Sequence, residues 1–303
     1  MPKIAVVTDS AACIPTALKQ QFDIHEVPFE LTWDGVIYRD GVDLTPTDFY
    51  RRFRQAHTYP TTSQPPFGAF TALYARLSQE YDGVVSIHVS ADMTGTVHTA
   101  RLAAEQAMTH QHGAPSSQPG EKSPDVLMRH RVPIRVLDSR TATIAEGFVV
   151  LAAARAAAAG ATLDQVVEQA EQVIGKVDFF ATLKTLEHIH RGGRIGEAAA
   201  LLGNQLKITP ILNLKNGRVS IVGLTRSWRH ALQEVVNMAV ERVRGKRDIH
   251  ASVFHADAPK DAEWLREQFL ARVQCVELHV TAFTPVMGAH TGPDVVGLVF
   301  YGD

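Results

Sequence analysis

The chain has 303 residues, of which 45% are hydrophobic and 20% charged, a composition typical of a folded chain of two domains with sizeable cores. Its 30 Lys and Arg residues against 32 Asp and Glu residues give a net charge of −2, so no overall positive field would attract nucleic acid. The two cysteines, Cys13 and Cys275, belong to no CxxC pattern, which argues against a disulfide framework and favours a reducing, cytoplasmic location.

Apolar runs and helical stretches alternate through the first half of the chain, a pattern that predicts a parallel α/β sheet. Strands are expected at 4–7, 24–31, 36–38, 83–89 and 133–137. Helices are expected between Pro15 and Phe22, from Thr45 onward, at 67–79, at 97–108, and in an alanine-rich stretch that ends at Ala159. The longest apolar stretch, 148–161, falls short of the roughly 20 residues that a membrane-spanning helix needs, so we expect no such span.

Three of these expected strands are followed by small hydroxyl-bearing or acidic residues. The segments are Thr8-Asp9-Ser10, Ser90 to Thr96, and Asp138-Ser139. Ligands of open α/β sheets bind beyond the carboxyl ends of the strands, where these segments would lie. Taken singly, each segment is more readily explained as an ordinary turn or helix cap.

In the second half of the chain, Asn216-Gly217 indicates a hairpin among further expected strands and helices. This pattern predicts a mixed sheet. Strands are expected at 179–183, 207–214, 219–224, 249–255, 276–280 and 295–301, and helices at 162–174, 228–243 and 260–269. We place the domain boundary near residue 158, which gives an N-terminal domain of residues 1–158 and a C-terminal domain of residues 159–303. The polar stretch at about 109–131 is expected to be an exposed insertion loop.

Several enzyme classes lack their motifs in this sequence. The Walker A loop, the GxGxxG dinucleotide turn, the GxSxG nucleophile elbow and the HExxH zinc motif are all absent. The His188-Ile189-His190 segment is better explained by packing than by metal binding, and the basic run Arg242–Arg247 by a solvated helix end.

What remains is a set of polar groups suited to holding a small anion. The hydroxyls of Thr62, Ser63 and Thr94 can donate hydrogen bonds to a carboxylate or a phosphate. Arg194, in an expected Gly-Gly-Arg turn, and His290, in an expected tight glycine-rich turn, can add charge-assisted donors, and in each case the glycines let the backbone come close.

The order of these segments resembles one family. The motifs are Thr8-Asp9-Ser10, Thr61-Thr62-Ser63-Gln64-Pro65, Ser90 to Thr96, Asp138-Ser139, Gly192-Gly193-Arg194-Ile195, Pro210-Ile211-Leu212, Asn216-Gly217 and His290-Thr291-Gly292-Pro293. In this order, and across essentially the whole chain, they resemble the DegV proteins, bacterial fatty-acid-binding proteins similar to the carrier subunit of fatty acid kinase.

The resemblance implies an α/β protein of two domains. The N-terminal domain is expected to be a three-layer α/β/α unit with a parallel sheet, and the C-terminal domain a two-layer α/β unit with a mixed sheet. A long-chain fatty acid would lie in a tunnel, mostly in the C-terminal domain, with its carboxylate at the domain junction. A separate ATP-dependent kinase would phosphorylate that carboxylate for phospholipid synthesis, so the carrier itself would not be an enzyme.

The resemblance also implies which residues bind the carboxylate. They are Thr62, Ser63, Thr94, Gly95, Arg194 and His290. Two positions depart from the family's pattern: Thr94 stands where a serine is usual, and Asp294 stands where a glycine is usual. Asp294 would bring a negative charge close to an anion site. The insertion at 109–131 is longer than expected for the family.

The expected partners follow from this resemblance. They are a long-chain fatty acid and the ATP-binding subunit of a fatty acid kinase, with transient membrane contact compatible with the role and no nucleic acid. We expect no cofactor or metal besides the bound fatty acid, a monomer, and a cytoplasmic location. Two alternatives stay open: a phosphate-ester or acyl-group hydrolase or transferase that uses His290 as its base, and a lipid-responsive regulator without a kinase partner.

Overall fold

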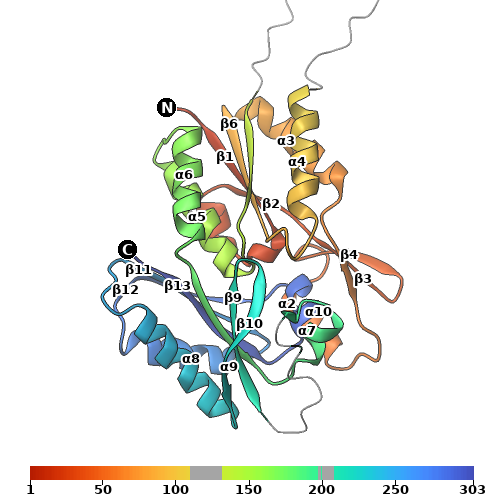
Figure 1. The fold of residues 1–303 in the computed structure, drawn as a ribbon. Helices are drawn as coiled ribbons and strands as arrows, with labels where there is room; N and C mark the ends of the chain where they lie inside the picture. The colour runs from red at the N-terminus through yellow and green to blue at the C-terminus, as the bar shows by residue number, and fades with distance from the viewer. Residues whose placement is uncertain (110–131, 197–198, 200–207) are drawn as a thin grey trace, which may run out of the picture.

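The computed structural model describes residues 1–109, 132–196, 199 and 208–303, whose strands form three sheets (Figure 1). The first sheet has the order β2 (Ile24–Val27), β1 (Ile4–Asp9), β6 (Gly83–His88) and β7 (Ile134–Asp138), with every neighbouring pair parallel. The strands β1 and β6 are buried along their whole length, as their continuous apolar runs predicted. The expected parallel sheet is therefore confirmed.

Helices cover both faces of this sheet, which confirms the three-layer arrangement. One face carries α5 (Ile144–Ala158) and α6 (Leu163–Ile174), and the other carries α3 (Phe67–Glu80) and α4 (Thr96–Thr109) (Figure 1). The helix α5 is apolar nearly all round because it contacts β1 on one side and the second sheet through β13 on the other.

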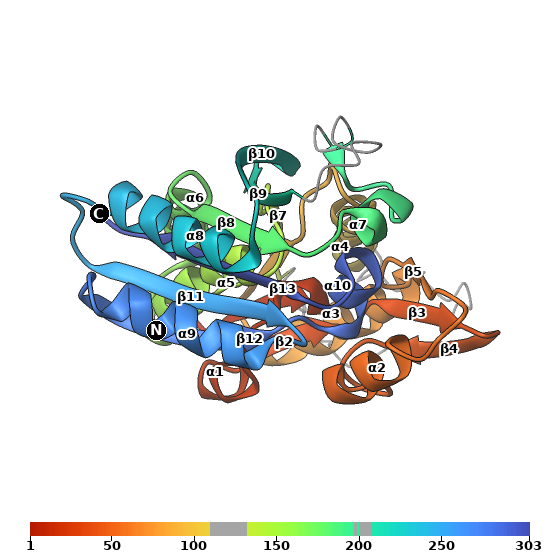
Figure 2. The same cartoon turned by 90° about the horizontal axis from the view of Figure 1, so that it is seen from below.

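The second sheet is mixed, as expected. Its order is β10 (Arg218–Thr225), β9 (Thr209–Lys215), β8 (Asp178–Leu183), β13 (Val295–Tyr301), β11 (Ile249–Ala256) and β12 (Cys275–Ala282). Only β11 and β12 pair in parallel. The helices α8 (Trp228–Arg242) and α9 (Pro259–Leu270) lie together along this sheet (Figure 2). They cover its outer face, and the inner face shares a core with α5.

The single strand expected at 24–31 is in fact two strands in different sheets. Pro28 follows β2 and cannot donate a ladder hydrogen bond, so the chain turns there into β3 (Glu30–Trp33). The strand β3 pairs with β4 (Val36–Arg39) and with the short β5 (Thr61–Ser63) in a small antiparallel sheet. Five short helices complete the described fold: η1 (Ser10–Ala12), α1 (Thr16–Gln21), α2 (Pro46–Phe53), α7 (Glu187–Arg191) and α10 (Pro285–Thr291).

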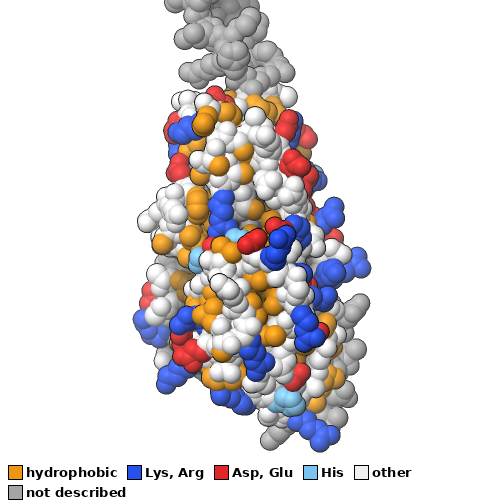
Figure 3. Space-filling view, turned by 90° about the vertical axis from the view of Figure 1, so that its left-hand side faces the viewer, with side chains coloured by type: hydrophobic (Ala, Val, Ile, Leu, Met, Phe, Trp, Pro, Cys, Tyr) orange, Lys and Arg blue, Asp and Glu red, His pale blue; other side chains and the backbone are white. Residues whose placement is uncertain are grey.

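A polar cluster ties α5, which covers the first sheet, to the second sheet. On the face that carries α6 and β12, acidic, basic and His side chains meet about midway down the molecule (Figure 3). Nη2 of Arg155, on α5, donates to both carboxylate oxygens of Glu277, on β12, at 2.6 Å. The imidazoles of His250 and His279 lie 2.6 and 2.8 Å from the same carboxylate. These hydrogen bonds and the Arg155 charge hold the pKa of Glu277 well below its usual range.

The boundary near residue 158 stays a prediction. The helix α6 packs against α5 and β6 of the first sheet, so we propose that the division falls between α6 and β8. Apart from Thr109, the last residue of α4, the expected insertion at 109–131 lies outside the described residues. Within the ranges that the structure covers, no helix has both the length and the apolar character needed to span a bilayer.

Candidate functional site

A cavity of about 430 Å³ lies where the two large sheets and the small sheet meet. It is lined by residues of β5, β8 and β9, by the loop after β6, by the two residues before α5 and by α10. All six residues expected to bind a carboxylate line it: Thr62, Ser63, Thr94, Gly95, Arg194 and His290. The fold thus brings together segments up to 228 positions apart.

Most of the remaining wall is apolar. Its aliphatic and aromatic side chains include Phe29, Val89, Phe179, Leu183, Leu212, Phe283 and Val295. The volume falls in the range of roughly 300–1,000 Å³ that is usual for small-molecule sites. A few polar groups among many apolar ones suit a ligand with one polar end and a hydrocarbon body.

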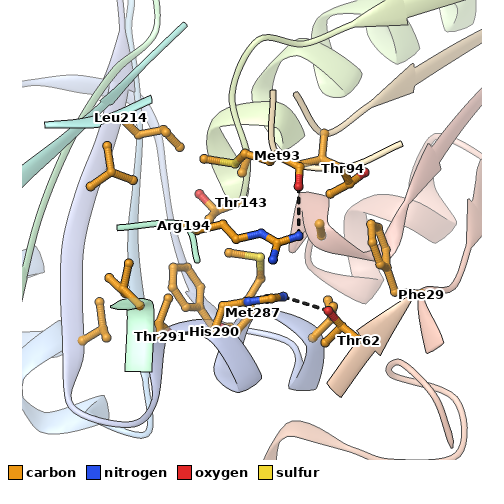
Figure 4. A pocket seen from close by; sticks show the side chains of 18 of the residues that line it. Phe29, Thr62, Met93, Thr94, Thr143, Arg194, Leu214, Met287, His290 and Thr291 are labelled. Atoms are coloured by element: carbon orange, nitrogen blue, oxygen red, sulfur yellow. Dashed lines mark hydrogen bonds between the residues drawn. The ribbon is translucent and has the colours of Figure 1, made fainter. Parts of the chain in front are cut away.

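Thr62 and His290 form the central polar pair of the cavity. Thr62 is the middle residue of β5, where it pairs with Leu31 of β3. His290 was expected in a glycine-rich turn but lies in α10, which Pro285 begins at a position suited to proline. The Thr62 hydroxyl and Nε2 of His290 are 2.8 Å apart, and Figure 4 shows this bond at the cavity wall.

The imidazole of His290 is neutral at neutral pH. Burial lowers its pKa to about 4, with a smaller contribution from the positive charge of Arg194. Nδ1 is buried without a hydrogen-bond partner among the described residues and lies against Gly192, where a Cβ would approach it to 2.6 Å. A bare acceptor is less costly to bury there than an unpaired N–H, so we assign the ring hydrogen to Nε2. With Nε2–H donating to Thr62, the hydroxyl hydrogen of Thr62 is free to point to a ligand.

Thr94 and Gly95 form the loop that opens α4. The Thr94 hydroxyl oxygen accepts from the backbone N–H of Thr96 at 2.9 Å, as a helix-capping residue does, and it also lines the cavity. Gly95 lies close to Gln64, because a Cβ at residue 95 would lie 2.3 Å from Oε1 of Gln64 and would displace that side chain. Gln64 in turn donates to the hydroxyl of Thr99 at 2.6 Å. Ser63 and Gly95 are exposed at the rim.

Arg194 spans the cavity between two segments. Nη1 donates to the carbonyl of Gly192 at 2.6 Å, and Nη2 donates to the carbonyl of Met93 at 3.1 Å. Figure 4 shows the guanidinium reaching across the cavity toward Met93. Its hydrogen bonds go to neutral carbonyls, so its positive charge is available to an anion at the rim.

The negative charge of Asp294 is directed away from this anion site. Its carboxylate lies 3.4 Å from Nη2 of Arg54 and 3.2 Å from Nζ of Lys184. Asp294 keeps a positive φ of 61°, the conformation that the glycine usual at this position adopts readily. The two cations therefore offset the charge that the sequence brings close to the site.

Sequence reasoning missed two residues of the wall. Gln64 belongs to the Thr61–Pro65 motif, and its place in that motif is the signal that could have indicated it. Thr143 precedes α5 at a φ of 62°, which is rare for a β-branched residue, and its buried hydroxyl has no hydrogen-bond partner in the part of the chain that the structure describes. No local signal distinguished Thr143 from an ordinary helix cap.

A second hydrogen-bonded chain has the order of a catalytic triad but lies in the core. Nδ1 of His88 is 3.0 Å from Asp9, and Nε2 is 2.7 Å from the hydroxyl of Ser86. Tyr74 donates to the same serine, and all four side chains are fully buried and away from the cavity. A substrate cannot reach this serine, so the chain is structural. Within the described ranges, no group of three or more His, Cys, Asp or Glu residues could hold a metal ion.

Comparison with known proteins finds relatives that match this chain over nearly its whole length. A DegV domain-containing protein of Listeria monocytogenes is 32% identical over 300 residues, covering 98% of each chain. A DegV domain-containing protein of Mycobacterium tuberculosis is 32% identical over 298 residues, covering 97% of this chain and 96% of that protein.

Solved structures of related proteins have the same fold. A DegV family protein from Thermus thermophilus, described as binding fatty acid, superposes with a TM-score of 0.87 at 30% identity, covering 100% of both chains. DegV from Bacillus subtilis, described as a fatty acid binding protein, gives a TM-score of 0.85 at 29% identity, again over 100% of both chains. The model of the DegV family, described as an uncharacterised protein family, matches residues 3–303. This chain belongs to the DegV family.

Proposed function

We propose that this protein binds one long-chain fatty acid, with the acyl chain in the apolar cavity and the carboxylate beside Thr62, Arg194 and His290. The observation that carries the proposal is the composition of this cavity: a largely hydrocarbon wall with hydrogen-bond donors gathered in a few side chains. Two DegV structures at 29–30% identity are described as fatty-acid-binding proteins, which supports the same ligand class here.

The apolar wall accounts for most of the binding free energy in this proposal. Each buried methylene contributes about 0.8 kcal/mol, so about 14 of them contribute on the order of 11 kcal/mol before the costs of association. A small polar phosphate ester would leave the side chains of Phe179, Leu212 and Phe283 without a partner. An acyl chain would cover them.

The carboxylate needs hydrogen bonds to stay ionised in a partly buried site. The Thr62 hydroxyl can donate one, since its oxygen already accepts from His290 in the tautomer assigned above. Arg194 adds a positive charge, and Thr94 and Ser63 offer further hydroxyls. We propose that Gly95 contributes by keeping the loop backbone close to the carboxylate.

The second part of the proposal concerns what happens to the carboxylate. Arg194, Ser63 and Gly95 are exposed, so the carboxylate end of the cavity opens to solvent. A separate ATP-dependent kinase could therefore reach it without the acyl chain leaving the cavity. This protein would act as the carrier subunit, a monomer in the cytoplasm, and its acyl phosphate product would serve phospholipid synthesis. A lipid-responsive regulator would share the binding step and lack the kinase.

The hydrolase alternative is less well supported. Thr62 and His290 have the spacing of a nucleophile and its base, but an imidazole with a pKa of about 4 is a weak base at neutral pH. In the described part of the chain, no third group orients Nδ1 of His290.

Native mass spectrometry of the purified protein, followed by organic extraction, tests the proposal. We expect one long-chain fatty acid per chain, lost or depleted in Thr62→Val. A protein that carries no lipid and takes up no added fatty acid would contradict it. Addition of a fatty acid kinase ATP-binding subunit and ATP then separates the two roles: acyl phosphate formation supports the carrier, and binding without phosphorylation supports the regulator.

A further inference from the structure

The helix that carries His290, α10, is held by contacts with both halves of the molecule. Its flanking residues are attached to β11 of the second sheet: Phe283 donates its N–H to the carbonyl of His255 at 2.8 Å, and Asp294 donates to Ala256 at 2.7 Å. Between these attachments α10 crosses toward the first half of the chain, where it contacts α2, β3, β5 and η1. The position of His290 therefore depends on contacts from both halves.

One buried carboxylate fixes α10 from the side of the first half. Oδ1 of Asp40 accepts the backbone N–H of Val286 at 2.9 Å, across 246 positions of sequence. Asp40 is fully buried, and its own backbone is held because its N–H donates to the carbonyl of Phe29 at 2.8 Å. Val286 lies four residues, about one helical turn, before His290, and both residues line the cavity.

The surroundings of Asp40 make it a costly residue to bury. Among the described residues, its second oxygen, Oδ2, has no hydrogen-bond partner of ordinary geometry, and neither has the buried hydroxyl of Tyr50 nearby. Burial raises the pKa of Asp40 to about 7, against the opposing effect of the Ser10 hydroxyl, the Val286 N–H and the Thr284 hydroxyl. The carboxylate offsets part of this cost by accepting the N–H of Val286, one of the N–H groups in the first turn of α10 that have no partner within the helix.

Close packing of α10 against α2 acts together with the Asp40 contact to fix the position of α10. A Cβ at Gly288 would lie 2.5 Å from a ring carbon of Phe49 and 2.7 Å from the Tyr50 hydroxyl. The glycine thus brings α10 directly onto α2, and little room is left for a shift toward it. A helix held by Asp40 at Val286 and by this contact at Gly288 presents His290 in one place.

We propose that Asp40 is a positioning residue that holds α10 so that Nε2 of His290 meets the hydroxyl of Thr62. The proposal deepens the proposed function and rests on it, because the consequence is a higher affinity for the ligand's carboxylate. Asp40 itself does not touch the ligand; it acts through the backbone of Val286 and the turn that follows.

Two variants of Asp40 and one matched control test the role. Asp40→Ala removes the acceptor, and Asp40→Asn keeps a carbonyl oxygen for the Val286 N–H. Asp43→Asn is the control, because Asp43 is three residues away but exposed and paired with Arg39 at 2.8 Å. The readouts are the imidazole ¹⁵N and ¹H signals of His290 in lipid-free protein and the dissociation constant for oleate. Circular dichroism establishes that each variant is folded.

We expect Asp40→Ala to shift the His290 signals and weaken oleate binding about tenfold or more. Asp40→Asn should restore the affinity to within about threefold, and Asp43→Asn should match the wild type in both readouts. In a Thr62→Val background, Asp40→Ala should add little, since both changes interrupt the same contact.

Unchanged His290 signals in a folded Asp40→Ala protein would overturn the proposal. So would a further loss of about tenfold in oleate affinity when Asp40→Ala is added to Thr62→Val. If Asp40→Ala does not fold, Asp40→Asn decides: a tenfold loss of affinity with unmoved His290 signals contradicts the positioning role. A wild-type protein that binds no oleate would contradict the proposed function instead. The His290 signals of the lipid-free variants would still test the role of Asp40 in that case.

Discussion

The hydroxyl of Thr62 lies 2.8 Å from Nε2 of His290, although 228 positions separate the two residues in the chain. One belongs to a three-residue strand of the small sheet and the other to a seven-residue helix between β12 and β13 of the second sheet. Neither element is large enough to be stable alone. The contact therefore exists only when both halves of the fold are assembled, and it marks the polar end of the cavity.

Replacing Thr62 by valine should weaken fatty-acid binding about tenfold or more, because one buried hydrogen bond to a charged group contributes roughly 1.5–3 kcal/mol. Thr62→Ser keeps the hydroxyl and should stay within a few-fold of the wild type. Isothermal titration with oleate measures both. Equal losses for the serine and valine variants would mean that the methyl group, and not the hydroxyl, makes the contact.

The free energy of unfolding should depend on pH through His290. Its pKa is about 4 in the folded chain and about 6.5 in a model peptide, so the unfolded chain binds the extra proton between these values. The contribution of His290 to stability is therefore present above pH 6.5 and is lost as the pH falls toward 4.

Urea unfolding at pH 7 and pH 4.5 measures this effect. Over that interval the wild type should lose about 2–3 kcal/mol more than His290→Gln does. His57→Gln, at an exposed histidine, is the matched control and should follow the wild type. If His290→Gln shows the full pH dependence of the wild type, the ring is not held neutral by burial.

Much of the fold could be predicted from local sequence, because its main strands are long and buried. Continuous apolar runs such as 4–7 and 83–89 can be satisfied only inside a sheet that is covered on both faces, and both became parallel strands. The strand β5 gave no such signal. Its three residues, Thr61–Ser63, are polar and partly exposed, and they are extended only because β3 pairs with them.

The residues of the site could be predicted from the sequence, but their arrangement in space could not. Thr62 and His290 stood in recognisable motifs, and both line the cavity. The helix around His290 was not predicted, because Gly288 and Gly292 flank the histidine and suggest a turn. In the structure Gly288 is needed for the close contact of α10 with Phe49 and Tyr50, which no local pattern could reveal.

Gly192→Ala should displace the ring of His290. A Cβ at residue 192 would lie 2.6 Å from Nδ1, closer than such atoms approach, and Gly192 has an ordinary negative φ of −71°, so no backbone strain accompanies the change. We expect oleate binding to weaken several-fold as the bond between His290 and Thr62 is disturbed. Gly68→Ala, at a helical position with open space around it, is the control and should leave binding unchanged. An unaffected Gly192→Ala protein would show that the ring can move without cost.

Thr143→Val should stabilise the protein, whereas Thr8→Val should destabilise it. Both threonines are buried, but the Thr143 hydroxyl has no partner within the described ranges, whereas the Thr8 hydroxyl donates to Oε1 of Glu146 at 3.2 Å. Removing an unpaired buried hydroxyl should raise the free energy of unfolding by about 1 kcal/mol, since its desolvation is no longer uncompensated. Removing the Thr8 donor leaves the fully buried Glu146 carboxyl without that bond and should cost about 1–3 kcal/mol. Valine is β-branched like threonine, so the strain at the positive φ of residue 143 is the same before and after.

Urea unfolding of lipid-free protein measures both changes, because a bound ligand would add its own stabilisation. A destabilised Thr143→Val protein in that state would mean that the hydroxyl is hydrogen-bonded to an ordered water in the cavity. In that case Thr143→Ser, which keeps the hydroxyl, should be more stable than Thr143→Ala. If serine and alanine at position 143 are instead equally stable, the hydroxyl contributes nothing, and the loss in the valine variant comes from its packing alone.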